Sequence, residues 1–302
     1  MLTVRSSHIV YFSGTGGTAR VARAFQAALD SRGISTALTE LNGPPYPAVN
    51  ADLLVLLYPV YAANAPQPVR EWLAVAPAGE GRCAAVLSVS GGGEVSPNTA
   101  CRVYPARRLA QKGYRVLWDS MLVMPSNFMI PYSDALCALL LREAPRRAEQ
   151  IVGNLLAGNV RRSHPLLWDR MLTRLLGIER FGSRMFGKQL RAGDRCNGCG
   201  WCARHCPRGN ITLKADRPVF GDRCVLCTRC LYGCPTNAIT PGFGKFALLR
   251  DGFNLDAIEA RTAQTDDFPS VEALTHGIAM NGVRKYLNEA KGAPANGQTN
   301  QV

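Results

Sequence analysis

Cysteine clustering constrains this chain more than any other feature of its sequence, because eight of the eleven cysteines fall between Cys196 and Cys234. The pattern CxxCxxCxxxCP occurs there twice, with a period of 28 residues. The first copy contains Cys196, Cys199, Cys202 and Cys206, and the second contains Cys224, Cys227, Cys230 and Cys234. The repeat extends beyond the cysteines, since GDRC begins both copies. Such spacing is typical of a metal or cluster site.

The spacing within each copy indicates which thiolates share a cluster. Two residues between successive cysteines let three thiolates surround one corner of a 4Fe-4S cubane, while the fourth, followed by proline, ligates the other cluster. The sequence therefore predicts two 4Fe-4S clusters with crossed ligation. Cluster one takes Cys196, Cys199, Cys202 and Cys234, and cluster two takes Cys224, Cys227, Cys230 and Cys206. Gly198 and Gly200 permit tight turns that aim backbone N–H groups at the sulfurs.

Disulfides and zinc are the alternative uses of these cysteines. The N-terminus carries no recognisable export signal, so disulfides fit poorly, and zinc sites usually bring pairs of CxxC knuckles. Cys83, Cys101 and Cys137 have no partners at ligand spacing, and we expect them to be small buried apolar residues. His205 lies between two ligands and is expected at the surface.

Strands and helices alternate over the first 150 or so residues. A short apolar run, residues 8–12, is followed by a hydroxyl-rich loop and by helical spacing over residues 19–29. Further buried strands are expected at residues 53–58, 84–88 and 115–124. This alternation predicts a doubly wound parallel α/β sheet, in which ligands bind at the carboxyl ends of the strands.

Two kinds of phosphate site fit the loop after the first strand, which comprises Ser13, Gly14, Thr15, Gly16, Gly17 and Thr18. GxGxxA is the dinucleotide fingerprint, with Glu40 at a tolerable distance for a ribose contact. Alternatively, three hydroxyl side chains join the amides of a helix N-terminus to hold one terminal phosphate. We favour the mononucleotide, because a pyrophosphate needs close glycine contact rather than hydroxyls.

Residues 9–19, IVYFSGTGGTA, resemble the FMN-phosphate signature of the flavodoxin family, from which Phe25 departs mildly. Residues 191–242 resemble bacterial-type ferredoxins with two 4Fe-4S clusters, so a small α+β domain is implied there. Together they resemble flavodoxin/ferredoxin fusion proteins, sometimes called ferrodoxins, and residues 124–128 resemble a loop of that family near the flavin. The resemblance implies two loops around the isoalloxazine ring, with Pro59, Tyr61 and Asn64 in one and Ser90, Gly91, Gly92 and Gly93 in the other. Tyr61 either stacks on the ring or packs against the sheet edge.

The expected domains are a flavodoxin-like domain over 1–160, a basic amphipathic connecting helix over 161–190, the ferredoxin domain over 191–242, and a helical extension over 243–302. The connecting helix, centred on residues 165–187, is either a membrane-surface helix or an interdomain brace packed on a domain, and we favour the brace. In the extension we expect one amphipathic helix over residues 270–290 and a disordered polar tail from 291.

The formal net charge is +13, and residues 142–195 carry 12 basic and 5 acidic residues. That stretch is either a docking surface for an acidic redox partner or a solvated face. No nucleic-acid-binding motif and no apolar run long enough to span a bilayer occurs, so the expected location is the cytoplasm.

These features together predict electron transfer between two 4Fe-4S clusters and an FMN, with conversion between one- and two-electron steps. The alternatives are an FMN-dependent reductase of a small acceptor, fed by its own ferredoxin domain, and a redox-sensing binding protein.

Overall fold

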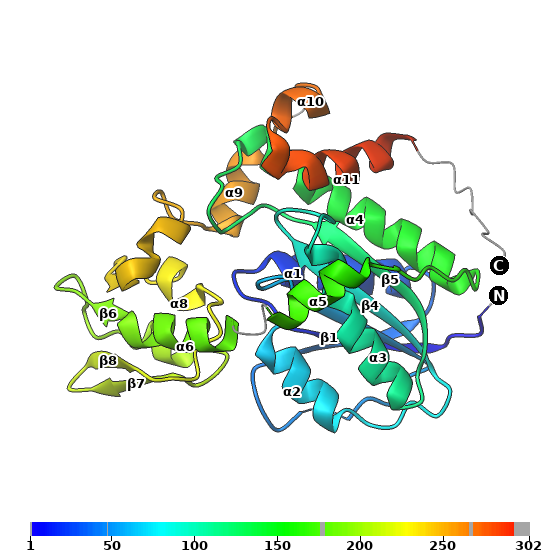
Figure 1. Ribbon diagram of the computed structural model, residues 1–302, viewed down its shortest axis with the longest axis horizontal. Coiled ribbons are helices and arrows are strands. Elements are labelled where there is room, and N and C mark those ends of the chain that lie inside the picture. The colour runs from blue at the N-terminus through cyan, green and yellow to red at the C-terminus, as the bar shows by residue number, and fades with distance from the viewer. Residues whose placement is uncertain (1, 47, 176–178, 266–267, 293–302) are drawn as a thin grey trace.

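The N-terminal half is built around a five-stranded parallel sheet (Figure 1). The computed structural model describes residues 2–46, 48–175, 179–265 and 268–292. The strands are β1 (Ser6–Tyr11), β2 (Ser35–Glu40), β3 (Leu53–Pro59), β4 (Cys83–Ser90) and β5 (Arg115–Val123). They lie in the order β2-β1-β3-β4-β5, and every adjacent pair is parallel. This is the strand order of flavodoxin-like doubly wound sheets, so the predicted fold class is confirmed.

Helices cover both faces of this sheet. Helices α1 (Gly17–Asp30) and α4 (Asp134–Leu156) pack on one face, and α2 (Gln67–Val75) and α3 (Val103–Gln111) pack on the other. The α1 side chains that helical spacing placed on one face are buried, among them Val21, Phe25 and Leu29. Strands β3 and β4 are apolar on both faces because helices bury both of their sides.

The cysteine repeat forms a small separate domain of two antiparallel ribbons and two short helices. Strand β6 (Arg191–Ala192) pairs with β9 (Ile239–Thr240), and β7 (Ile211–Lys214) pairs with β8 (Arg217–Phe220). Helix α7 (Trp201–Arg204) begins after the left-handed residue Gly200, and α8 (Arg229–Tyr232) begins after Thr228, which is also left-handed. Because residues 200 and 228 are 28 positions apart, the two sequence copies share one backbone conformation, even where threonine replaces glycine.

Two helices connect the domains, whereas the sequence predicted one. They are α5 (Leu167–Leu175) and α6 (Glu179–Gln189), and the residues between them, including Ile178, lie outside the described part of the chain. The expectation that the apolar side chains of this segment pack on a domain is wrong for α5, because Leu167, Trp168 and Met171 are exposed.

The C-terminal extension turns back onto the flavodoxin-like domain beside α4 (Figure 1). It contains η3 (Gly242–Ala247), α9 (Leu255–Thr262), α10 (Val271–Leu274), η4 (Ile278–Met280) and α11 (Asn281–Gly292). The expected single helix over 270–290 is wrong, because Gly277 takes a positive φ of 85° and separates α10 from η4. Residues 293–302 of the expected polar tail lie outside the described residues. Within the described ranges, no helix combines the length and the hydropathy that crossing a membrane requires.

Candidate cofactor-binding site

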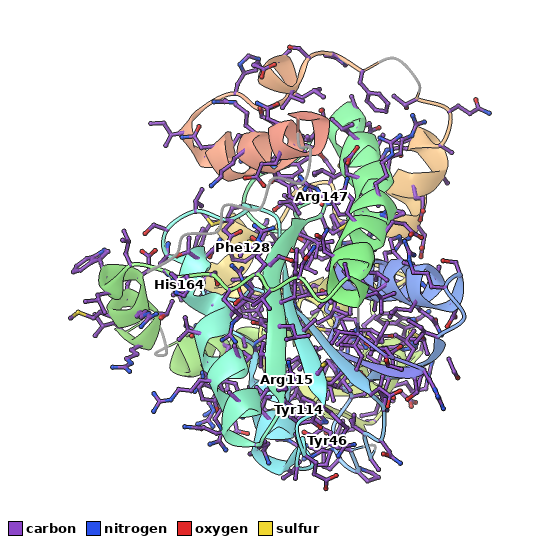
Figure 2. All side chains as sticks on the ribbon, turned by 90° about the vertical axis from the view of Figure 1, so that its right-hand side faces the viewer. Tyr46, Tyr114, Arg115, Phe128, Arg147 and His164 are labelled. Atoms are coloured by element: carbon purple, nitrogen blue, oxygen red, sulfur yellow. The ribbon has the colours of Figure 1, made fainter. Side chains whose placement is uncertain are left out.

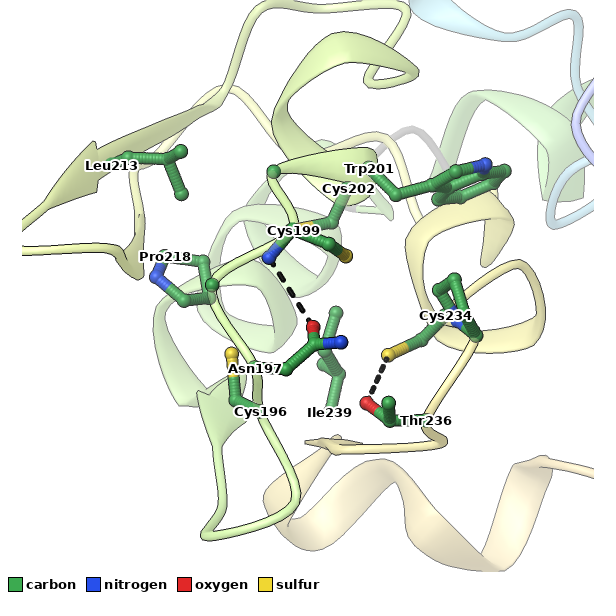
Figure 3. A pocket seen from close by; sticks show the side chains of 13 residues that line it. Cys196, Asn197, Cys199, Trp201, Cys202, Leu213, Pro218, Cys234, Thr236 and Ile239 are labelled. Atoms are coloured by element: carbon green, nitrogen blue, oxygen red, sulfur yellow. Dashed lines mark hydrogen bonds between the residues drawn. The ribbon is translucent and has the colours of Figure 1, made fainter.

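Two cavities in the small domain are lined by the two crossed cysteine sets. The first is lined by Cys196, Cys199, Cys202 and Cys234, and the second by Cys206, Cys224, Cys227 and Cys230. Figure 3 shows the first cavity, where Cys234 from the second copy faces the three cysteines of the first copy. The structure therefore brings together the thiols that the crossed scheme groups, although they lie up to 38 residues apart in sequence.

The thiols of each set line a cavity rather than meet at one point. Among the residues that the structure describes, no three His, Cys, Asp or Glu side chains converge closely enough to hold one metal ion. A mononuclear zinc site requires such convergence, with each sulfur about 2.3 Å from the metal. The thiols instead surround a cavity, which is the arrangement that a 4Fe-4S cubane needs.

Backbone amides point at the sulfurs of the two cysteines that precede proline. The amide of Asn210 donates to Sγ of Cys206, and the amide of Ala238 donates to Sγ of Cys234, each at 3.3 Å. Burial raises the pKa of Cys234, but the bonds from the amides of Ala238, Thr236 and Ile239 and from the Thr236 hydroxyl outweigh it, so the net pKa lies below the ordinary value. These bonds favour a thiolate at Cys234, and an equivalent amide bonds the sulfur of Cys206 in the other copy.

The two cysteine sets differ in burial. Cys199 of the first set is exposed, whereas Cys227 of the second is buried. Burial raises the pKa of Cys227 to about 12 and that of Cys230 well above its ordinary value. Metal ligation by these cysteines would require the loss of their protons.

The second cysteine set lies against the flavodoxin-like domain. Cys227 and its neighbour Val225 belong to the apolar core that continues under helices α2 and α3. A Cβ added at Gly14 would lie 2.9 Å from the carbonyl oxygen of Cys227 and would collide with Oη of Tyr61. The first residues of the hydroxyl-rich loop therefore touch a cysteine of the second set directly.

That loop has the features of a phosphate cradle. It ends at the N-terminus of the 14-residue helix α1, where Gly16 is the N-cap with φ of 98°. The side chains of Ser13 and Thr18 are buried there, and Oγ of Ser13 accepts a hydrogen bond from the amide of Ala19 at 3.3 Å. Buried hydroxyls beside the free amides of a helix N-terminus fit an anionic phosphate. Thr15 lies at the mouth of the loop, where its Oγ1 accepts a 2.8 Å hydrogen bond from Nδ2 of Asn127.

Glu40 does not face this loop as a ribose ligand would. Its carboxylate forms an ion pair of 2.6 Å with Arg229 of the small domain. Because Glu40 is engaged in this ion pair across the domain contact, it does not serve as the ribose ligand that the dinucleotide interpretation requires. Arg229 itself was not singled out in the sequence, since its partner lies 189 residues away.

The two loops expected around a flavin ring are both engaged with other segments. Tyr61 packs edge-on against Phe12, with ring centroids 6.3 Å apart. Tyr61 lies two residues after Pro59, the last residue of β3, and its backbone forms an isolated antiparallel β-bridge with Asn64. Nδ2 of Asn64 donates to the carbonyl oxygen of Thr173 in α5 at 2.9 Å.

In the second loop, Oγ of Ser90 accepts a 3.1 Å hydrogen bond from the amide of Gly92. Gly91 lies against Ser126, and Gly93 packs on Gly282 at the start of α11, where a Cβ would lie 2.5 Å from the Gly282 carbonyl carbon. The C-terminal extension therefore holds this loop in place, a contact that no local sequence pattern indicates.

The remaining sequence expectations concern single residues. Cys83, Cys101 and Cys137 are buried, as expected; Cys83 and Cys137 belong to the apolar core, whereas Sγ of Cys101 lies 3.9 Å from Nη1 of buried Arg102. His205 is exposed and stacks on Trp201 with ring centroids 4.1 Å apart.

Residues 193–212 match the model of the family Fer4, described as a 4Fe-4S binding domain. No curated protein matches the chain. Among solved structures, a flavodoxin from the domain Archaea is similar at 16% identity and a TM-score of 0.33, covering 49% of this chain and 97% of that one. The general stress protein 14 of Treponema denticola, solved with FMN, has 14% identity and a TM-score of 0.37, covering 50% and 98%. The two-electron reduced Megasphaera elsdenii flavodoxin has 20% identity and a TM-score of 0.34, covering 48% and 98%.

The chain thus joins a flavodoxin-like domain, identified by its strand order, to a ferredoxin-type segment that matches a 4Fe-4S binding domain. This combination supports a role in electron transfer.

Proposed function

We propose that this protein carries two 4Fe-4S clusters and one FMN and transfers electrons between them, converting between one- and two-electron steps. When bound, a flavin exchanges one or two electrons and each cluster exchanges one. The observation that carries the proposal is the contact between Cys227 and Gly14, which places a cysteine of the second set against the phosphate loop.

The residues of this chain would hold the groups in a row. The first set, with exposed Cys199, would hold the cluster that faces solvent. The second set, buried at the domain contact, would hold the cluster between the first one and the flavin. The FMN phosphate would rest on the hydroxyls of Ser13, Thr15 and Thr18 and on the first amides of α1.

A redox protein with an acidic surface is the proposed partner of the exposed cluster. Arg195, Arg204 and Arg217 are exposed beside the first cysteine set, and Nη1 of Arg217 lies 3.4 Å from the carbonyl oxygen of Cys196. Cations around an exposed cluster steer an acidic partner toward it.

Anaerobic purification followed by iron, sulfide and flavin analysis tests this proposal. We expect about eight iron atoms and one FMN per chain, and dithionite should bleach both chromophores. In Cys199→Ser about half of the iron should be lost, whereas Cys137→Ser, outside both sets, should keep all of it. About one zinc per cysteine set and no flavin would contradict the proposal.

A further inference from the structure

Helix α5 is attached to the protein by its polar side. The carboxylate of Asp169, only 3% exposed, accepts hydrogen bonds of 2.5 Å from the hydroxyls of Ser96 and Thr99. One turn later, Thr173 is also buried, and its carbonyl oxygen accepts the hydrogen bond from Asn64. These bonds come from segments at the carboxyl edge of the sheet, and they hold the polar side of α5 toward the protein.

The apolar side of α5 consequently faces away from the molecule. Its exposed fractions are 72% for Leu166, 75% for Leu167, 64% for Trp168, 57% for Met171 and 62% for Leu175. Positions 167, 168, 171 and 175 share one side of a helix, opposite to the buried positions 169 and 173. Figure 2 shows the helix that follows His164 at the margin of the molecule, with its side chains pointing outward. A helix in a globular protein normally buries its apolar side, whereas α5 buries its polar side and exposes its apolar side.

The charges around this apolar stripe are positive. Arg170 and Arg174 are exposed along its border, and Asp169, which is the one acidic residue of α5, is buried under the helix. Arg161 and Arg162 are exposed in the segment that leads into the helix. The stripe is therefore complementary to a surface that is apolar inside and anionic at its boundary.

We propose that α5 is a docking surface for an anionic phospholipid bilayer, lying in the plane of the headgroups. Tryptophan, leucine and methionine bordered by arginines are typical of interfacial helices, whose apolar side enters the acyl boundary while the cations meet the headgroups. Asp169 and Thr173 have partners within the protein, so the side of α5 that faces away presents apolar side chains bordered by arginines, which is the composition of an interfacial helix. A helix of nine residues buries little area, so binding needs both the stripe and the charge.

This inference does not depend on the cofactors, but it concerns the same edge of the molecule. Helix α5 is bonded to Asn64 in the loop after β3 and to Ser96 and Thr99 beyond the loop after β4. Docking through α5 would hold the proposed flavin loops close to the lipid surface.

Flotation of the intact protein with lipid vesicles tests the proposal. We expect binding to vesicles of phosphatidylglycerol and phosphatidylcholine at about 0.01 M salt, where the screening length is about 30 Å, and much weaker binding at about 1 M salt. Binding should fall about tenfold or more in Leu167→Ser/Met171→Ser/Leu175→Ser, and similarly in Arg170→Glu/Arg174→Glu. The matched control Ile278→Ser, another exposed apolar position, should bind as the wild type does.

Trp168 offers a readout that does not depend on removing the stripe. Its fluorescence should shift to the blue on binding, and Trp168→Phe should still bind but lose the shift. Unchanged iron and flavin content would show that each variant is folded. No vesicle binding at low salt, or equal binding by the stripe variant, would overturn the proposal. A dimer that dissociates in the stripe variant, without vesicle binding, would also overturn it and assign the stripe to a second copy.

Discussion

Nη2 of Arg229 donates a hydrogen bond of 2.6 Å to the carbonyl oxygen of Ser13, across the contact between the two domains. Nε of the same side chain donates to the carbonyl oxygen of Gly14 at 2.9 Å, and Nη2 also pairs with Glu40. Arg229 lies between the second and third cysteines of the second motif. One side chain thus links the second cysteine set to the phosphate loop, which makes the two proposed cofactor sites a single unit.

Arg229→Ala should loosen this unit. Each hydrogen bond to a charged group contributes about 1.5–3 kcal/mol, and the Arg229 side chain is largely buried, so the free energy of unfolding should fall by about 2 kcal/mol. FMN affinity should fall as well, because the carbonyls that orient the loop are released. Chemical denaturation followed by circular dichroism and flavin titration measure both effects. Arg107→Ala, at an exposed position on α3, is the control, and an R229A protein equal to it would refute the linking role.

Gly14→Ala should separate the domains by steric conflict. The added Cβ would collide with Oη of Tyr61 and lie 2.9 Å from the backbone oxygen of Cys227, which cannot rotate away. We expect faster reaction of buried Cys227 with a thiol reagent after iron removal. Gly153→Ala has nothing within 4 Å of its Cβ and should react like the wild type. Equal labelling of the two variants would mean that the contact tolerates a methyl group.

Local spacing was sufficient to predict how the cysteines group and where β1, β3 and α1 lie. Ligand spacing is set by turns of two or three residues, and helical periodicity directly identifies Val21 and Phe25 as core residues. The contact of Arg229 with Ser13 could not be predicted in this way, because it depends on how two finished domains fit together. The same holds for Gly93 and Gly282, which meet only after the C-terminal extension turns back.

Helix α5 shows the limit of periodicity most clearly. Its sequence is strongly amphipathic, and the general rule buries the apolar side. The structure buries Asp169 instead, since Ser96 and Thr99, about 70 residues earlier, supply the hydrogen bonds that a buried carboxylate requires. The sequence pattern of a helix shows that it has an apolar and a polar side, but it does not show which of the two packs against the rest of the protein.

Arg102 is a buried cation whose removal should be costly. It is 1% exposed and donates to Oδ1 of Asp119 at 3.1 Å, to Oγ of Ser88 at 3.0 Å, and to Glu94 in the loop after β4. Arg102→Ala leaves buried Asp119 with less compensation, so we expect a loss of about 3–5 kcal/mol in unfolding free energy.

Two further variants separate the lost charge pairing from general damage at this position. Arg261→Ala removes an arginine that is 51% exposed from an ion pair with Asp134, which is 52% exposed, and should cost less than about 1 kcal/mol. Arg102→Met/Asp119→Asn should recover part of the stability lost in Arg102→Ala, as denaturation midpoints would show. If the double variant is no more stable than Arg102→Ala, the stability lost in Arg102→Ala comes from packing rather than from an unpaired charge.

His8 should make stability depend on pH. Burial lowers the pKa of His8 below its ordinary value of 6.5, while its Nε2 lies 2.9 Å from Oγ1 of Thr39. The unfolded chain binds the proton more readily, so stability is fully present above about pH 6.5 and is lost as pH falls toward the folded pKa. The slope cannot exceed about 1.4 kcal/mol per pH unit for one group. Denaturation of His8→Gln between pH 7 and 5 should show a smaller slope than the wild type, and an equal slope would contradict this assignment.

Crossed ligation has the sharpest test, because pairs of substitutions separate it from the uncrossed arrangement. Cys199 and Cys234 line one cavity, whereas Cys206 lines the other. Cys199→Ser/Cys234→Ser should therefore lose one cluster and keep about four iron atoms, while Cys199→Ser/Cys206→Ser should lose both clusters. If each motif held its own cluster, Cys199→Ser/Cys206→Ser would keep about four iron atoms and Cys199→Ser/Cys234→Ser would lose both clusters. Iron analysis of the anaerobically purified variants decides between the two, with Cys137→Ser/Cys83→Ser as the control that keeps all iron. Cys206 and Cys234 occupy equivalent positions in the two motifs, and each accepts a backbone amide bond at 3.3 Å, so a difference in iron content between the two double variants reports ligand grouping.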